Sequence, residues 1–431
     1  MSCTRHTPIL ARLTNSVFAL AFGGAACAQE APDSPQIANL PLKSTLAQRA
    51  ATVGKKSGSG GGKDFMHGHV GHAKPGPWGA IEYCTTYLEA PVELLNATKV
   101  SSLALDWRFL GFTEAAVEKL FASADLPAAL RAELLDHGKW RRDGDTAVVT
   151  VSPELLEALP ADARAAIYAV LARWPENRFH FEPNIVRGGN VEEWLQGSGL
   201  RPAIRNTIAK MRYRRGETWL FSDNVLILRM AESDAERLQI RKALSRIPSL
   251  VATVEVGPET NLEQLTEYWT CRRHFLDNVP FLNTAVATQE LFRVDLVHLL
   301  PATVRKLLYT YPNETHGRGG YYPDCHWTSL NFFNYEPLER LAEPPLATAY
   351  TLENFFEVPA PERLGDVLFL MDKATGNAYH SCVYIADDIV FTKNGRSRTS
   401  PWVLMKLEDV RELYAIYQKT QTVTYRLKTL K

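Results

Sequence analysis

A cysteine in the last third of the chain has surroundings that favour thiol chemistry. Cys325 stands in "YYPDCHWTSLNFF" (321–333), directly after Asp324, a residue type that often caps helices. As the first helical residue it would meet unpaired backbone N–H groups and the positive end of the helix dipole, which both favour the thiolate. The pattern therefore predicts Cys325 as a nucleophile, and the alternative is a small buried core residue.

A thiolate nucleophile needs an imidazole that takes its proton and later returns it to the leaving group. His326 is adjacent, but successive helical residues point about 100° apart, so we expect its ring to point away from the thiol. The segment "AYHSCVYIADDIVFTKNG" (378–395) reads as a strand, a tight turn at 386–388 and a second strand. His380, near the start of that hairpin, is the predicted partner.

The returning strand of the hairpin supplies candidates for a third polar residue. It brings Thr392 and Asn394 level with His380, within the uncertainty of the turn register. Either side chain could hold the ring in the required tautomer, and the amide of Asn394 is chemically the better orienter. Cys382, two residues after His380, belongs on the same strand face, where it is a core residue or a disulfide partner that would silence Cys325.

The elements around these residues must place the cysteine against a sheet. The periodicity of 294–311 predicts an amphipathic helix, and "GDVLFLM" (365–371) a Gly-Asp turn leading into a buried strand. Trp327, Leu330 and Phe333 give the cysteine helix one apolar face.

The order Asp-Cys at a helix start, Gly-Asp-hydrophobic strand and His-led hairpin resembles the NlpC/P60 cysteine peptidases over residues 300–410. That papain-like family packs a helix on an antiparallel sheet and mostly cleaves bacterial cell-wall peptides, although some members are amidases or acyltransferases. The resemblance implies that Cys325 is the nucleophile, His380 the general base, and Thr392 or Asn394 the third residue. It also implies that Tyr311 lies at the oxyanion site, together with the backbone N–H of Cys325.

The N-terminus predicts export. Residues 1–28 combine Arg5 and Arg12 with a short apolar core and the small-residue pattern Ala26-Cys27-Ala28, as in a signal peptide, and a lipid anchor on Cys27 is the alternative. Residues 29–80 form a predicted disordered arm rich in Gly, Ser and Pro. Its histidines could bind a divalent metal or belong to a solvated linker; they are His67, His69 and His72.

Residues 81–290 read as a mixed α/β region of unknown function. Strands are expected at 81–90, 146–151, 218–230 and 249–257, and helices at 112–138, broken by Pro127, at 152–174 and at 233–247. The last two strands with the helix between them predict a small β-α-β unit. Residues 291–431 are the predicted hydrolase domain, and the expected fold class is α+β.

Composition restricts the function further. Lys+Arg and Asp+Glu both number 48, so nucleic acid is not an expected partner, and no apolar stretch after the signal is long enough to span a bilayer. The sequence predicts an exported, periplasmic or extracellular cysteine hydrolase that needs no cofactor and no metal, and the resemblance implies a peptide or peptidoglycan stem as its substrate. An amidase or acyltransferase with another substrate, and a catalytically dead binding protein, stay open as alternatives.

Overall fold

A computed structural model describes residues 70–97, 102–257, 259–287, 292–313, 316, 322–416 and 420–430. The predicted signal peptide and residues 29–69 of the predicted arm, with His67 and His69, lie outside these residues. Residues 70–80 were also predicted as disordered, but they include a strand that pairs with residues 82–83, so that part of the prediction is wrong. His72 lies inside them, on strand β1, with its imidazole Nε2 3.6 Å from a carboxylate oxygen of Glu82.

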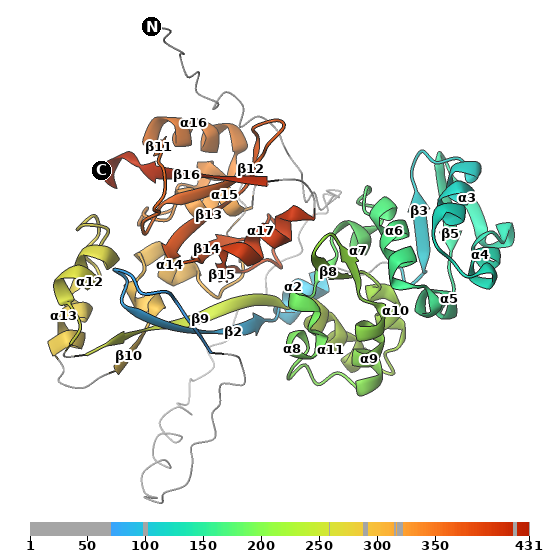
Figure 1. The fold of residues 1–431 in the computed structure, drawn as a ribbon, viewed down its shortest axis with the longest axis horizontal. Coiled ribbons are helices and arrows are strands. Elements are labelled where there is room, and N and C mark those ends of the chain that lie inside the picture. Colours follow the sequence, from blue (N-terminus) through green and yellow to red (C-terminus); the bar gives the residue numbers. More distant parts are fainter. Residues whose placement is uncertain are drawn as a thin grey trace, which may run out of the picture.

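An antiparallel ribbon of two long strands organises the molecule (Figure 1). Strand β2 (Ala80–Leu88) leads away from the part of the molecule that residues 292–430 form, here called the C-terminal part. Strand β9 (Ile247–Val256) leads back beside it, with Ile81 opposite Val254 and Leu88 opposite Ile247. The chain between them, residues 92–97 and 102–246, folds at the far end of the ribbon as a separate body, here called the inserted lobe.

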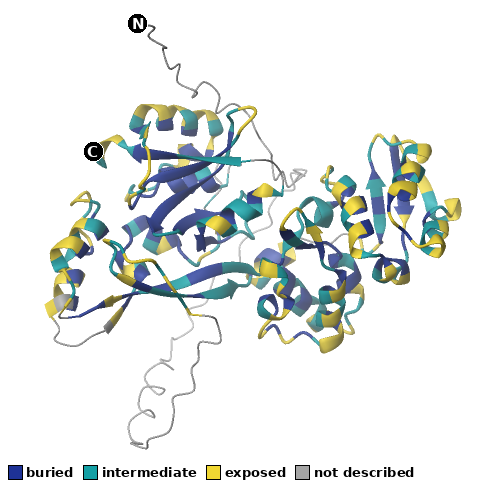
Figure 2. Ribbon diagram, in the orientation of Figure 1, coloured by how far each residue is buried: buried dark blue, intermediate teal, exposed yellow. Residues whose placement is uncertain are grey.

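The inserted lobe has its own apolar core, which draws on side chains from Leu105 to Leu244. Figure 2 shows this second buried centre apart from that of the C-terminal part. Two small antiparallel sheets, in the orders β3-β5-β4 and β6-β8-β7, lie among short helices. The elements are α2 (Val92–Ala97), β3 (Asp106–Phe109), α3 (Glu114–Ser123), α4 (Ala128–Leu134), η1 (His137–Lys139), β4 (Trp140–Asp143), β5 (Thr146–Thr150), α5 (Pro153–Ala158), α6 (Ala161–Leu171), α7 (Arg178–Phe181), β6 (Asn184–Ile185), η2 (Arg187–Gly189), α8 (Val191–Trp194), α9 (Pro202–Met211), β7 (Tyr213–Arg215), β8 (Thr218–Phe221), α10 (Asn224–Arg229) and α11 (Asp234–Leu244).

The ribbon belongs to a four-stranded antiparallel sheet of order β1-β2-β9-β10, which packs against the C-terminal part. The hydroxyl of Tyr309 donates to the carbonyl of Leu250 at 2.7 Å, and the backbone N–H of Leu404 donates to the hydroxyl of Ser249 at 3.2 Å. The elements of this section are β1 (Gly71–His72), α12 (Leu262–Trp269), α13 (Val279–Ala287), β10 (Phe292–Asp295), η3 (Leu296–Leu299) and α14 (Ala302–Leu307).

The C-terminal part is built on a six-stranded antiparallel sheet of order β11-β16-β12-β13-β14-β15. Helix α15 packs on β13 and β14, and its Trp327 and Leu330 join the core on that face, as the apolar spacing predicts. Helix α17 covers the other face, where Tyr414 packs with Cys382 and Met405. The elements are α15 (Cys325–Leu330), η5 (Glu339–Ala342), α16 (Pro344–Asn354), β11 (Phe355–Glu357), β12 (Val367–Asp372), β13 (Ala378–Ala386), β14 (Ile389–Lys393), β15 (Trp402–Lys406), α17 (Leu407–Ala415), β16 (Thr420–Leu427) and η6 (Lys428–Leu430).

The Gly-Asp turn before β12 is fixed by a buried ion pair and a close contact. Both oxygens of the fully buried Asp366 accept from Arg426, at 2.8 and 2.7 Å. Gly365 has a φ of +90°, and a Cβ there would come within 2.3 Å of the Phe333 ring. This turn therefore requires glycine, and it ties β12 to β16.

The α+β class and the helix packed on an antiparallel sheet are confirmed. Most predicted elements are also found, including α3 and α4 on either side of Pro127, helices α5 and α6, and the β13–β14 hairpin. None of the helices in the described ranges is long and apolar enough to cross a membrane.

Four predictions about elements and boundaries differ from the structure. Within 218–230 only 218–221 is a strand, because α10 follows at once, and β8 and β9 belong to different sheets, so there is no β-α-β unit. Residues 294–311 begin as strand β10 and become helical only in η3 and α14. Finally, the expected boundary at residue 290 does not follow the packing, because β2, β9 and α12 share their core with the C-terminal sheet.

Candidate active site

Cys325 is the first residue of α15, and its position is fixed by the cap before it. A side-chain oxygen of Asp324 accepts from the backbone N–H of Trp327 at 2.9 Å, which is the predicted N-cap. The other oxygen of Asp324 accepts from Nε of Arg396 at 3.1 Å. The helix has only six residues, yet both oxygens of its capping residue are bound, so the position of Cys325, a buried residue, is fixed.

Two imidazoles act on this thiol. Burial alone would raise the pKa of Cys325, but the charges of His326 and then of His380 outweigh burial and lower the pKa of the thiol well below its ordinary value. The converse holds for His326: burial would lower its pKa, and the neighbouring thiolate raises it. The arrangement favours a thiolate–imidazolium pair.

His380 has the contacts expected of a proton-transferring base. Its ring is fully buried on β13, and Nε2 lies 3.1 Å from the hydroxyl of Thr392 on β14. Nδ1 is buried and has no hydrogen-bond partner in the described part of the chain, so it is the ring nitrogen that is available to the thiol. Of the two candidates for the third position, the structure brings Thr392 to His380.

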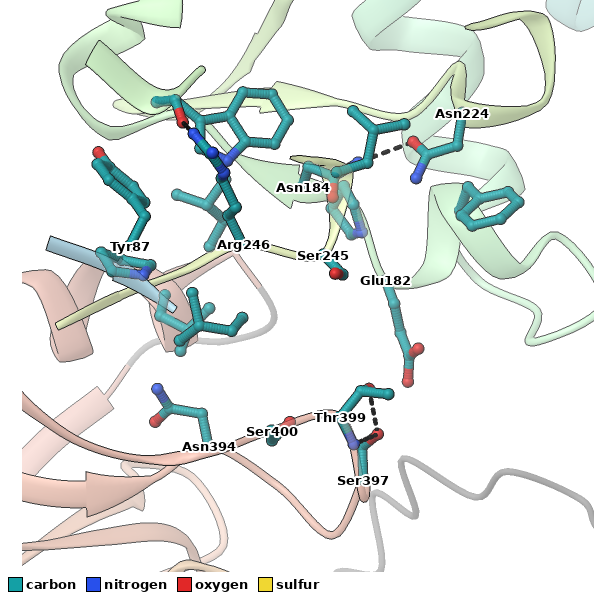
Figure 3. Close-up of a pocket in the computed structure, with 18 of the residues that line it drawn as sticks. Tyr87, Glu182, Asn184, Asn224, Ser245, Arg246, Asn394, Ser397, Thr399 and Ser400 are labelled. Atoms are coloured by element: carbon teal, nitrogen blue, oxygen red, sulfur yellow. Dashed lines mark hydrogen bonds between the residues drawn. The ribbon is translucent and has the colours of Figure 1, made fainter. Parts of the chain in front are cut away.

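Asn394 lies elsewhere. The β14 strand ends at Lys393, and the amide of Asn394 turns toward β15, where its Nδ2 donates to the sulfur of Met405 at 3.2 Å. The prediction that its amide orients His380 therefore does not match its contacts. Its Oδ1 atom is buried without a partner among the described residues, and the side chain lines a neighbouring pocket (Figure 3).

The contacts of Tyr311 do not connect it with Cys325. Its hydroxyl is buried without a hydrogen-bond partner in the described segments. Burial first, and then the negative charge of Glu89, raise the pKa of this phenol. Its role at the oxyanion site stays a prediction.

His326 is the residue that sequence reasoning missed. We expected its ring to point away from the thiol, and this expectation is wrong, because the ring hydrogen-bonds Cys325 and its other side is held by β13. Nδ1 lies 3.0 Å from the hydroxyl of Ser381, which in turn donates to Ser329 at 3.1 Å. Each histidine thus has one nitrogen on a hydroxyl group and interacts with the same thiol. No local sequence pattern indicates this contact, because Ser381 lies 55 residues after His326.

Lys393 is a second group that the sequence did not single out. Its ammonium is fully buried and donates to the carbonyls of Gly395 and Ser397 at 2.7 and 3.0 Å. Burial lowers its pKa to about 7, against the opposing charges of Asp324 and Cys325. A buried cation therefore lies on the Asp324 side of the thiol.

No disulfide silences the thiol within the described residues, because Cys84, Cys271, Cys325 and Cys382 are all free. Cys382 is fully buried among apolar side chains, and burial, then the charge of Cys325, raise its pKa. It is thus the core residue next to the site. In the described ranges no group of three His, Cys, Asp or Glu side chains could hold a metal ion.

In comparisons with protein-family models, with curated proteins and with solved structures, no significant match to this chain was found.

Proposed function

We propose that this protein is a cysteine hydrolase that cleaves amide bonds, with Cys325 as the nucleophile. The observation that carries the proposal is that the charges of two imidazoles act on one cysteine thiol at a helix start, and that each imidazole has a hydroxyl partner of its own. A buried structural cysteine does not need such surroundings. Cys382, on strand β13, is an example: no imidazole lowers the pKa of its thiol, and burial raises it.

In the proposed reaction the proton of the Cys325 thiol passes to His380, the thiolate attacks the carbonyl carbon of the amide, and the carbonyl oxygen becomes an oxyanion. When the intermediate collapses, the C–N bond breaks and the imidazolium of His380 gives its proton to the departing amine, which leaves a thioester on Cys325. Water, deprotonated by His380, then attacks the thioester and releases the acid and the thiol. The backbone N–H groups of Cys325 and His326, which precede the Trp327 N–H bound by Asp324, are the proposed donors to the oxyanion.

His380 is the better candidate for this proton transfer. Its Nε2 is held by Thr392, whose hydroxyl fixes the tautomer, and Nδ1 is left for the thiol. The charge of His326 lowers the pKa of the Cys325 thiol more than that of His380, so we propose that His326 keeps the resting thiolate ionised.

For the substrate we propose a peptide, and in particular the stem peptide of bacterial peptidoglycan. The support is the order of residues that resembles the NlpC/P60 peptidases, together with the helix on an antiparallel sheet that those residues form here.

The test is digestion of purified muropeptides by the wild-type protein and by C325A, with C271A as the matched control, because Cys271 is a thiol that hydrogen-bonds the carbonyl of Leu364. We expect new amino termini with the wild type and C271A and none with C325A. Products that C325A also generates would refute Cys325 as the nucleophile. Thiol reactivity of Cys325 without any product would refute the cell-wall substrate and favour an amidase or acyltransferase acting elsewhere.

A further inference from the structure

A pocket of about 340 Å³ lies between the inserted lobe and the C-terminal sheet (Figure 3). The lobe contributes residues 182–185 and 245–246 to its walls, and the other side is formed by residues 394–400, between β14 and β15, and by α17. The ion pair of Arg187 with Asp409, 3.1 Å between Nε and Oδ1, joins the two sides. The pocket is therefore built from both parts of the molecule.

The pocket is a direct neighbour of the Cys325 site. The segment 394–400 that forms one wall also carries Arg396, which holds Asp324 beside the thiol. On α17, Leu413 lines the pocket, and the next residue, Tyr414, stacks on the His380 ring with 4.2 Å between centroids. The segments that line the pocket thus also carry the residues that contact Asp324 and His380.

The arginine side chains that line the pocket already have contacts within the protein. Arg187 pairs with Asp409, Arg246 pairs with Glu89 at 2.6 Å, and Arg241 donates to the carbonyl of Leu95. The guanidinium of Arg178 lies over the Phe179 ring, 5.5 Å from its centroid. These contacts leave little reason for an anionic ligand to be preferred.

Glu182 is different, because its carboxylate has no hydrogen bond or ion pair to any described residue. Figure 3 shows the side chain extending across the pocket toward Ser397 and Thr399, whose hydroxyls already bond each other at 2.7 Å. Burial raises the pKa of this carboxyl, and only the charge of Arg178 opposes that effect. A second acceptor without a partner, Oδ1 of Asn394, lines the opposite wall.

We propose that this pocket binds a free amino group of the peptide substrate, with the carboxylate of Glu182 as the anchor. An ammonium group supplies the N–H donors that the Glu182 carboxylate lacks, and its charge offsets the cost of keeping this half-buried carboxylate ionised. The assignment rests on the proposed function only in taking the substrate to be a peptide.

Binding can be measured without catalysis, by titration calorimetry on the C325A protein with the tripeptide Ala-γ-Glu-Lys and with the same peptide acetylated on both amino groups. Two singly acetylated peptides distinguish the α-amino group from the lysine side chain as the source of the ammonium. The variant is E182Q, and the matched control is E176Q, an exposed glutamate of the same lobe.

We expect the free tripeptide to bind C325A and to bind C325A/E182Q about tenfold or more weakly, the loss of one charge-assisted hydrogen bond. E176Q should leave the affinity unchanged, and one of the singly acetylated peptides should retain it. Equal binding of the doubly acetylated peptide, or no effect of E182Q, would overturn the assignment. Since C325A performs no thiol chemistry, neither result depends on whether the wild type hydrolyses muropeptides.

Discussion

The ring of Tyr414 stacks on the imidazole of His380, with 4.2 Å between the centroids and 24° between the planes. Tyr414 belongs to α17, on the face of the sheet opposite α15. The helix that supports His380 is therefore not the helix that carries Cys325. With Thr392 at its edge and Tyr414 on its face, the ring has a single orientation available.

Replacing Tyr414 by Ala should leave His380 without this support. We expect a loss of about 3 to 5 kcal/mol in the free energy of unfolding, from the cavity, and a fall in kcat beyond what the remaining folded fraction explains. The measurements are chemical unfolding and turnover per folded molecule. Y414F keeps the ring and should keep kcat; if Y414A also kept it after correction for folding, the stack would be structural only.

The reactivity of Cys325 should show the lowered pKa of its thiol. An ordinary cysteine, with a pKa of about 8.5, alkylates slowly below neutral pH, whereas Cys325 should react with iodoacetamide well below pH 7. Removing either imidazole should raise the pKa, and H326A more than H380A, because His326 supplies the larger charge effect.

The sites of labelling are read by mass spectrometry. Cys271 and Cys382 are the internal controls, because burial raises the pKa of both thiols and they should stay unlabelled in the same samples. Unchanged pH profiles in both histidine variants would show that the thiol is not paired with imidazole.

Substitutions at Thr392 and Asn394 distinguish which of these two residues orients the His380 ring. T392V keeps the shape but removes the hydroxyl at 3.1 Å from His380, and we expect kcat to fall about fivefold to tenfold, the equivalent of roughly 1 kcal/mol. T392S should restore most of it. N394A, whose amide contacts Met405, should leave the pH dependence of kcat unchanged; a shift in that dependence would instead assign the orienting role to Asn394.

Local signals predicted the parts of the site that depend on local geometry. Asp324 as a cap, Cys325 as the first helical residue and the hairpin with His380 and Thr392 on one face all follow from short-range patterns, and the structure has them. The choice between Thr392 and Asn394 depended on where β14 ends, and a strand end is set by tertiary packing more than by propensity.

The contact that holds the second imidazole is long-range and could not be predicted in this way. Ser381 lies 55 residues after His326, and its bond to the ring depends on how α15 lies on the sheet. The inserted lobe was missed for the same reason. Strands β2 and β9 pair across more than 150 residues, and antiparallel partners so far apart in sequence leave no shared pattern.

Asp366 should be among the most sensitive positions for stability. It is fully buried, and Arg426 is bonded to both of its oxygens, so D366A leaves a buried guanidinium without its partner. We expect a loss of about 3 to 5 kcal/mol in the free energy of unfolding, measured by chemical denaturation. D277N, which breaks the exposed pair with Arg305, should cost about 1 kcal/mol or less, and an equal effect of both would argue against the buried pair as the cause.

Lys393 should make stability depend on pH in a defined direction. In the folded protein burial lowers its pKa to about 7 from an ordinary 10.5, so the unfolded chain holds this proton through a range in which the folded protein has released it. Stability then rises with pH between about 7 and 10.5, because the unfolded state binds more protons there; below pH 7 the cost of burying the charge is present in full.

K393M removes this titration, and its free energy of unfolding should vary less than that of the wild type over the same range. It also loses the two bonds to the loop carbonyls, so the alkylation rate of Cys325 should change as residues 394–397 and Arg396 shift. K393R keeps a charge but adds bulk in a fully buried place. If K393M retained the wild-type slope between pH 7 and 10.5, another group would be responsible for it, and Lys393 would be charged throughout.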